Sequence, residues 1–467
     1  MSAQETLKVY SPFDQKLIKE VPMSGKKEAE AALKVAYDLF IDRKRWIPAH
    51  KKISILKKVQ EFMEADIETL TNTAAQEGGK PYQDSKVEVI RAINGIKLAA
   101  EEIGRLTGEQ IPMGLTEASS NRIAFTTREP IGVVVSISAF NHPLNLIVHQ
   151  TVTAFAAGCP VIVKPASTTP LSCLTFVDIL YKSGVPKDWV QVLITDNETA
   201  EVVVTDKRVN YLSFIGSAKV GWFLKSKLAP GTRCALEHGG AAPVIVEPDA
   251  DFKEMIPALV KGGFYHAGQV CVSVQRVFVH ETIAQALADA VASLASGLSV
   301  GNPLDKNTEV GPLISTKEVE RVEAWVKEAE AGGAKILCGG HKISATCYAP
   351  TVLWNPALDA KVSTEEIFGP VVCIYPYRDI DEAIREANRL DYHFQAAVFT
   401  QNLEVAVDTV QRLNATAVMV NDHTAFRVDW MPFGGRDVSG EGLGGIPYTM
   451  HEMTRVKLMV IKSKKLM

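Results

Sequence analysis

The stretch from residue 131 to residue 194 reads IGVVVSISAFNHPLNLIVHQTVTAFAAGCPVIVKPASTTPLSCLTFVDILYKSGVPKDWVQVLI. Short apolar runs in it alternate with longer segments of helical spacing: 131–137, 143–157, 161–163, 170–183 and 191–194. This βαβαβ order predicts a parallel sheet that is buried on both faces. Ligands of such sheets bind outside the carboxyl ends of the strands, so we expect functional residues where these runs end.

The pattern continues on both sides of this stretch. Upstream, short strands at 6–24 precede helical segments at 26–40, 49–65, 67–76 and 86–106. In the last of these, the predicted apolar positions are Val87, Ile90, Ile93, Ile96 and Leu98. Downstream, a helix at 200–205, a strand at 211–214 and a helix at 217–228 extend the first sheet, and residues 242–400 contain a second set of alternating strands and helices.

The fold class is therefore α/β, with two doubly wound parallel-sheet lobes and a small β element. The β element combines an alternating segment at 121–128 with the tail at 455–466, which we expect to be an edge strand that needs a partner.

Composition excludes several classes of protein. The chain has 467 residues, 46% hydrophobic and 22% charged, with a formal net charge of -4 and no basic tract, so we expect no nucleic-acid partner. No uncharged apolar segment is long enough to span a membrane, and no leader pattern opens the chain. Seven scattered cysteines without a C-x-x-C pair argue against disulfides and against a metal site, and favour a reducing, cytoplasmic location.

Two segments could carry chemistry. Cys271 follows the loop-forming residues Gly268 and Gln269, and a thiol in a suitable environment is a strong nucleophile, although a single cysteine is more often a buried apolar residue. Gly216 and Ser217 lie between a predicted strand and a helix, where backbone amides can face a phosphate. The G-x-G-x-x-G pattern at 440–445 lacks the strand-to-helix context that gives it meaning, so we interpret it as a glycine-rich turn.

Six motifs that occur in a fixed order along the chain indicate that these two segments belong to one functional site. They are Ala139-Phe140-Asn141-His142-Pro143-Leu144, Val163-Lys164-Pro165-Ala166-Ser167, Leu236-Glu237-His238-Gly239-Gly240, Gly268-Gln269-Val270-Cys271, Glu365-Glu366-Ile367-Phe368-Gly369-Pro370-Val371 and Pro432-Phe433-Gly434-Gly435. In this order and spacing, over nearly the whole chain, they closely resemble the aldehyde dehydrogenase superfamily. The resemblance implies NAD(P)-dependent oxidation of an aldehyde to the acid.

The resemblance also implies roles for three residues. Cys271 matches the nucleophile, which forms a thiohemiacetal and then a thioester. Asn141 matches the side-chain donor of the oxyanion site, which it shares with the backbone amide of Cys271. Glu237 matches the general base that activates the hydrolytic water.

On the cofactor side, Lys164 matches the residue that holds the adenosine ribose, and Glu366 and Phe368 match those at the nicotinamide riboside. Ser167 stands where many NAD-preferring members have a glutamate, so we expect NADP to be accepted and NAD to remain possible. The full set of implied cofactor-binding residues is Ser138, Phe140, Lys164, Ser167, Gly216, Ser217, Val220, Glu366 and Phe368.

The substrate end resembles the branch that includes phosphonoacetaldehyde, sulfolactaldehyde and lactaldehyde dehydrogenases. Arg91, His142 and Arg427 match positions that bind an anionic group there, and planar arginines suit such groups. Val270 replaces the arginine of the phosphonate-specific pattern, which favours a monoanionic or neutral polar aldehyde. The predicted substrate-binding residues are Arg91, His142, His149, Val270, Arg427 and Phe433.

The resemblance divides the chain into three parts. We expect a cofactor-binding domain at 1–112 and 132–236, a catalytic domain at 237–427, and an oligomerisation element with a substrate loop at 113–131 and 428–467. The family forms homodimers or homotetramers, so we expect one of these. Two alternatives stay open: a CoA-acylating dehydrogenase, against which Glu237 argues, and a cofactor-binding relative without turnover.

Overall fold

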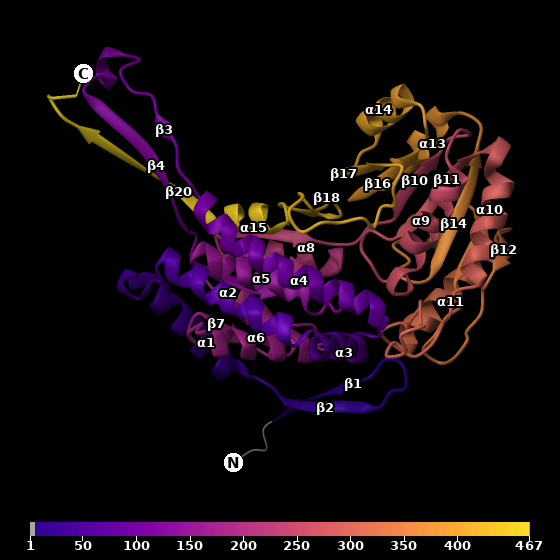
Figure 1. The fold of residues 1–467 in the computed structure, drawn as a ribbon, viewed down its shortest axis with the longest axis horizontal. Helices are drawn as coiled ribbons and strands as arrows, with labels where there is room; N and C mark the ends of the chain where they lie inside the picture. Colours follow the sequence, from indigo (N-terminus) through magenta and orange to yellow (C-terminus); the bar gives the residue numbers. More distant parts are fainter. Residues whose placement is uncertain (1–4, 467) are drawn as a thin grey trace.

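The computed structural model describes residues 5–466 as two lobes that lie side by side, with a β arm extending from the first (Figure 1). The first lobe is built around a six-stranded sheet in the order β19-β9-β8-β5-β6-β7. Strands β9, β8, β5, β6 and β7 are parallel, and β19 pairs antiparallel with β9. Strand order changes direction at β5, which creates a crevice at the carboxyl ends. The strands are β5 (Val133–Ile137), β6 (Val161–Lys164), β7 (Val190–Val192), β8 (Val209–Ile215), β9 (Arg233–Glu237) and β19 (Gly440–Glu441).

Helices cover both faces of this sheet, as the alternating pattern predicts, because alternate residues of β5 and β6 pack with α5 on one face and with α1 on the other. Every residue of α5 is buried, because α5 packs against β5 and β6 on one side and α4 on the other. The helices are α1 (Lys26–Ile41), α2 (Ala49–Ala65), α3 (Ile67–Gly78), α4 (Tyr82–Glu102), α5 (Asn145–Ala157), α6 (Leu171–Ser183), α7 (Asn197–Val204) and α8 (Ala218–Ser226).

Helix α4 corrects one prediction. It begins at Tyr82, directly after Pro81, rather than at residue 86. Its buried stripe includes Val89, Ala92, Ile93 and Ile96, which follow helical spacing, whereas the predicted apolar positions 87 and 90 are 53% and 51% exposed. The prediction is thus confirmed at Ile93 and Ile96 and wrong at Val87 and Ile90.

The second lobe is built around a seven-stranded sheet in the order β12-β13-β14-β11-β10-β16-β17. All neighbouring strands are parallel except β12 and β13. Strands β12, β13 and β17 were not predicted. The strands are β10 (Ala242–Val246), β11 (Val274–His280), β12 (Lys335–Cys338), β13 (Thr351–Trp354), β14 (Val371–Tyr377), β16 (Gln395–Phe399) and β17 (Ala417–Val420). The helices are α9 (Phe252–Phe264), α10 (Glu281–Ser296), α11 (Thr316–Ala331), α12 (Lys361–Thr364), α13 (Ile380–Ala387) and α14 (Leu403–Arg412).

The arm is a three-stranded antiparallel sheet in the order β20-β4-β3, formed by β3 (Gln110–Ile111), β4 (Arg122–Pro130) and β20 (Thr454–Lys462). The tail is an edge strand, as predicted, and its partner within this chain is β4. Beyond its first residue every position of β20 is exposed. Within residues 5–466, no helix is both apolar enough and long enough to cross a bilayer.

The remaining elements lie outside the two large sheets and the arm, or connect them. The hairpin of β1 (Thr6–Tyr10) and β2 (Leu17–Pro22) matches the predicted short strands. The glycine-rich segment at 440–445 contains β19 at its start and leads directly into α15 (Ile446–Glu452), so a helix does follow it, contrary to the sequence-based interpretation. Its strand pairs with β9 and returns the chain from the second lobe to the first. The short strands β15 (Tyr392–His393) and β18 (Arg436–Asp437) pair with each other nearby.

Candidate active site

A cavity of about 750 Å³ lies at the carboxyl ends of the first sheet, where residues of both lobes meet. It is lined by fifteen of the eighteen residues that the sequence nominated: Arg91, Ser138, Phe140, Asn141, His142, Gly216, Ser217, Val220, Glu237, Val270, Cys271, Glu366, Phe368, Arg427 and Phe433. Lys164, Ser167 and His149 lie outside this lining. Motifs that are far apart in the sequence are therefore brought to one site.

The loop before Cys271 has an unusual backbone. His266, Ala267 and Gly268 have φ angles of 48°, 54° and 71°, and a Cβ on Gly268 would lie 2.0 Å from the carbonyl oxygen of Gly369. The side chain of Gln269 holds the loop, because it donates to the carbonyls of His266 and Pro312 and accepts from the amide of Ile314. This geometry places the partly exposed Cys271 at the cavity.

The surroundings of Cys271 favour the protonated thiol. Burial raises its pKa well above the ordinary value, and the negative charge of Glu237 adds to the increase, while the positive charge of Arg427 opposes it. A base or a bound electrophile is therefore needed before the sulfur can attack.

Asn141 follows β5 and its side chain is buried. Its Nδ2 donates to the main-chain oxygen of Gln269 across 2.9 Å, which links the first lobe to the Cys271 loop. Because a carbonyl can only accept, this contact identifies the amide nitrogen, which retains a second N–H. Such a donor beside a nucleophile can stabilise a developing oxyanion.

Glu237 is the last residue of β9 and lines the same cavity. Burial raises the pKa of its carboxyl, and the charge of Arg427, whose Nη1 lies 4.0 Å from Oε1 of Glu237, opposes that shift. A carboxylate with a raised pKa is a better proton acceptor, so this position suits a general base.

The other end of the cavity fits a dinucleotide. Ser138 Oγ is buried and has no hydrogen-bond partner within residues 5–466, and Gly216 and Ser217 precede the nine-residue helix α8, whose N-terminus can face an anion. Glu366 accepts from the amide of Gly240 at 3.2 Å, and burial raises its pKa to about 7. The rings of Phe140 and Phe368 meet edge to face with centroids 5.9 Å apart. These polar, anion-binding and aromatic groups fit the phosphates, ribose and ring of NAD(P).

Lys164 and Ser167 lie beyond this lining. Lys164 ends β6, and its main-chain oxygen accepts from the amide of Ser138 at 3.1 Å. Burial lowers the pKa of its ammonium group, and Ser167 is exposed on the following loop. Between them in sequence, Ala166 does line the cavity, so both residues flank its edge.

At the substrate end, Arg91 is already paired. Its Nε and Nη2 donate to the two carboxylate oxygens of Asp429 across 3.1 Å and 2.7 Å. Asp429 also accepts from His149 at 2.8 Å and from Asn145 at 3.3 Å. Burial alone would raise the pKa of Asp429, but the hydrogen bond from His149 and the charge of Arg91 hold it well below its ordinary value. His149 thus supports Asp429 behind the cavity rather than lining it.

Asp429 is a residue that sequence reasoning missed. A single aspartate in a loop gives no signal of its own in the sequence. Only the fold brings it to Arg91, which is 338 residues away in the chain. His142 and Arg427 also have contacts in place: Nε2 of His142 lies 3.1 Å from the hydroxyl of Tyr265, and the guanidinium of Arg427 lies 3.5 Å from the ring centroid of Phe433.

Comparison with known proteins decides the family. Residues 1–459 match the model of the aldehyde dehydrogenase family. The chain belongs to the aldehyde dehydrogenase family. It is 38% identical over 458 residues to a 3-sulfolactaldehyde dehydrogenase of Priestia aryabhattai, and the aligned region covers 98% of this chain and 95% of the relative. It is 36% identical over 463 residues to a lactaldehyde dehydrogenase of Methanocaldococcus jannaschii, and the aligned region covers 98% of both chains.

A solved structure agrees with this assignment. The chain superposes on the glyceraldehyde-3-phosphate dehydrogenase of Methanocaldococcus jannaschii, complexed with NADP, with a TM-score of 0.94 and 35% identity over 99% of this chain and 100% of that one. The aldehyde dehydrogenase described here is thus an NAD(P)-dependent enzyme with the predicted α/β fold. These relatives fit a non-acylating aldehyde dehydrogenase and not the CoA-acylating or non-catalytic alternatives.

Proposed function

We propose that this aldehyde dehydrogenase oxidises a small polar aldehyde at Cys271, with Asn141 as oxyanion donor and Glu237 as general base. The observation that carries the proposal is that these three side chains line one cavity although they come from three separate segments of the chain. A nucleophile, an oxyanion donor and a base around one space are what acyl chemistry on a carbonyl requires.

Oxidation begins when the Cys271 sulfur attacks the aldehyde carbon and loses its proton to a base. The carbonyl oxygen then becomes an alkoxide, which the second N–H of Asn141 and the amide of Cys271 stabilise in the thiohemiacetal. When bound, NAD(P) supplies the hydride acceptor that turns this adduct into a thioester. Arg427 lies near enough to influence the charge of the thiolate.

Hydrolysis completes the cycle. Glu237 accepts a proton from water, the resulting hydroxide attacks the thioester carbon, and the carbon–sulfur bond breaks to release the acid and regenerate Cys271. The raised pKa of Glu237 supports this role, because a more basic carboxylate takes a proton from water more readily.

For the cofactor, we assign the pyrophosphate to Gly216, Ser217 and Val220, and the nicotinamide riboside to Ser138, Phe140, Glu366 and Phe368. Lys164 and Ser167 would hold the adenosine ribose at the edge of the cavity. The absence of a carboxylate at Ser167 supports acceptance of NADP as well as NAD, since a carboxylate there would repel a 2′-phosphate. In this scheme residues 1–112 and 132–236 provide most of the cofactor site, and residues 237–427 carry the nucleophile together with Glu366 and Phe368.

For the substrate, charge pairing supports a neutral or monoanionic polar aldehyde. The positive charge of Arg91 is matched by Asp429, that of Lys261 by Asp84 at 2.6 Å, and that of Arg427 in part by Glu237. Val270, beside the nucleophile, adds no charge. A cavity with so little uncompensated positive charge would desolvate a dianion at a high free-energy cost. Relatives that act on sulfolactaldehyde and lactaldehyde are consistent with this class.

The exposed apolar side chains of β20 support assembly of a homodimer or homotetramer through residues 113–131 and 428–467. We also propose a cytoplasmic location, because Cys271 needs a reducing environment to remain a thiol.

The test is replacement of the nucleophile. Cys271→Ala should reduce NADPH formation by at least about 10³-fold with every aldehyde, while NADP still binds with its original affinity. The matched control is Cys338→Ala, which removes another partly buried thiol, at β12 and outside the cavity, and should leave the rate unchanged. Substantial turnover by Cys271→Ala would refute the proposal.

A further inference from the structure

We propose that Lys80 and Glu88 are positioning residues that fix the main chain of residues 141–145 and thereby aim the amide of Asn141 at the reacting carbonyl. The inference rests on the proposed role of Asn141 as oxyanion donor. Neither Lys80 nor Glu88 lines the cavity, so any effect on the reaction passes through the segment that they hold.

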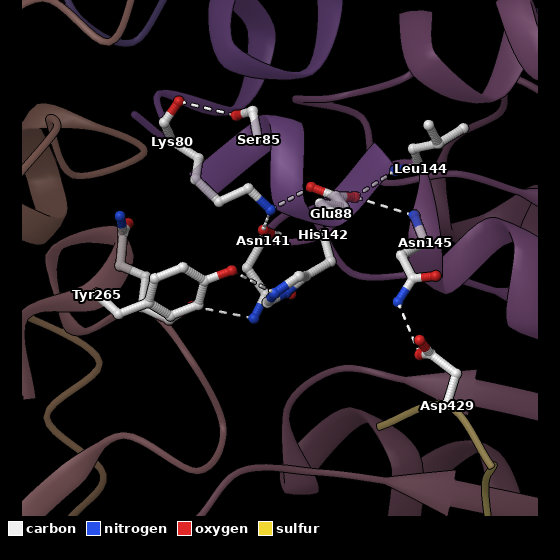
Figure 2. Close-up of polar contacts among 10 residues, drawn as sticks. Lys80, Ser85, Glu88, Asn141, His142, Leu144, Asn145, Tyr265 and Asp429 are labelled. Atoms are coloured by element: carbon white, nitrogen blue, oxygen red, sulfur yellow. Dashed lines mark hydrogen bonds and ion pairs between the residues drawn. The ribbon is translucent and has the colours of Figure 1, made fainter. Parts of the chain in front are cut away.

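Lys80 lies between α3 and α4 and is itself held in place. It follows Gly79, whose φ of 73° and contacts with Pro12 and Pro312 leave no room for a Cβ. Ser85 Oγ donates to the main-chain oxygen of Lys80 at 3.0 Å. The fully buried ammonium donates to the carboxylate of Glu88 and, at 3.0 Å, to the main-chain oxygen of Asn141 (Figure 2).

Glu88, on α4, holds the other end of the same segment. Its Oε1 accepts from the amides of Leu144 and Asn145, both at 2.9 Å, where α5 begins (Figure 2). Leu144 occupies the cap position of α5 and cannot itself accept these bonds, so a carboxylate from another helix satisfies them. The negative charge at this helix start is also favourable.

The segment is thus fixed at three main-chain atoms: the oxygen of Asn141 and the nitrogens of Leu144 and Asn145. With its backbone fixed, the side chain of Asn141 donates to the main-chain oxygen of Gln269 in the other lobe. Because one N–H of the Asn141 amide is held by this contact, the orientation of its second N–H is fixed as well. An oxyanion donor is effective only when its geometry is set before the reaction, because reorientation during the reaction costs free energy.

Stability alone does not account for this pair. A fully buried ion pair gains little net stability, since desolvation of both charges offsets their attraction, and apolar pairs of similar volume often do as well. Burial does lower the pKa of Lys80, as expected for an ammonium group without water, while the charge of Glu88 opposes the shift. What an apolar pair could not provide is a donor to the oxygen of Asn141 and an acceptor for two amides.

The double variant Lys80→Met/Glu88→Gln tests the proposal. It removes both charges together and keeps an oxygen for the amides of α5, so that no unpaired charge is left buried. Single-turnover NADPH formation should fall by roughly 10- to 100-fold, the cost of misplacing one oxyanion donor. In an Asn141→Ala background the same double substitution should have no further effect, because the group that it positions is absent. The Kd for NADP should be unchanged in both backgrounds.

Two further variants separate positioning from general stability. Lys52→Met is the matched control: Lys52 is a buried lysine that donates to the main-chain oxygen of Ala156 at the opposite end of α5, so its loss should lower Tm and leave the single-turnover rate unchanged. Should the double variant fail to fold, Glu88→Gln alone retains one oxygen for the two amides but presents a donor to Lys80. It should slow single turnover by roughly tenfold, again only when Asn141 is present.

Equal losses with and without Asn141 would show a merely structural role and overturn the inference, as would a full rate in the double variant. If Asn141→Ala by itself leaves the rate intact, the proposed role of Asn141 fails, and that outcome is distinguishable because it requires no change at Lys80 or Glu88.

Discussion

Replacing Asp429 by asparagine should shift the enzyme toward anionic aldehydes. Asp429 is 2% exposed and binds Arg91 through both carboxylate oxygens, so it cancels the charge of the arginine at the substrate end of the cavity. Asparagine has nearly the same shape and can still accept from His149, but it carries no charge. The substitution therefore changes the electrostatic potential of the cavity with little change in its volume.

The expected size follows from Coulomb's law. The substitution removes the repulsion between the carboxylate of Asp429 and the anionic group of the substrate. If these two charges lie about 6 Å apart, the repulsion is about 3 kcal/mol at an effective dielectric constant of about 20. Solvent near Arg91, whose side chain is 23% exposed, reduces this gain. We expect about 1.5–2 kcal/mol, or roughly a 10- to 30-fold rise in the preference for an anion. The same change leaves a partly buried arginine unpaired and should lower the free energy of unfolding by about 2 kcal/mol.

The assay compares kcat/KM for two aldehydes of equal length, one ending in a carboxylate and one in a hydroxyl group. In Asp429→Asn, the kcat/KM for the carboxylate aldehyde divided by that for the hydroxyl aldehyde should rise by roughly 10- to 30-fold. The control Asp206→Asn removes a partly buried carboxylate that pairs with Arg208 at 2.8 Å outside the cavity, so the ratio should not change. An unchanged ratio in folded Asp429→Asn would refute the charge argument.

Three other changes test the remaining roles. Glu237→Gln should leave a rapid first turnover of NADPH formation and slow the steady state by roughly 10²-fold, because thioester hydrolysis loses its base; a steady state equal to wild type would contradict that role. Ser167→Glu should lower kcat/KM with NADP relative to NAD by roughly tenfold, because the new carboxylate repels a 2′-phosphate, and a constant ratio would contradict the assignment of that pocket. The raised pKa of Cys271 predicts that its alkylation by iodoacetamide is slow at pH 7 and becomes faster only at strongly alkaline pH. Since the charge of Glu237 contributes to that shift, Glu237→Gln should move the alkylation profile to lower pH, as measured by mass spectrometry of the modified peptide.

Much of the fold could be predicted because its signals are local. The runs that became β5, β6 and β10 are continuous and apolar, since strands buried on both faces need no polar side. Strands β12 and β17 are only partly buried at the two edges of the second sheet, and their assignment depends on the neighbour with which each pairs. The buried positions of helix α4 could be predicted only in part, because they depend on the elements that pack against it.

By itself the sequence determined the order of the α/β units, the family, and the residue types that meet in the cavity, because each of these depends on residues close together in the chain or on motifs in fixed order. Only the tertiary structure decided which charges are paired. Asp429 neutralises Arg91, and Lys80 and Glu88 hold the segment of Asn141, through contacts between distant segments of the chain. Electrostatic interactions depend on distance and burial in three dimensions, and neither quantity is encoded by spacing along the sequence.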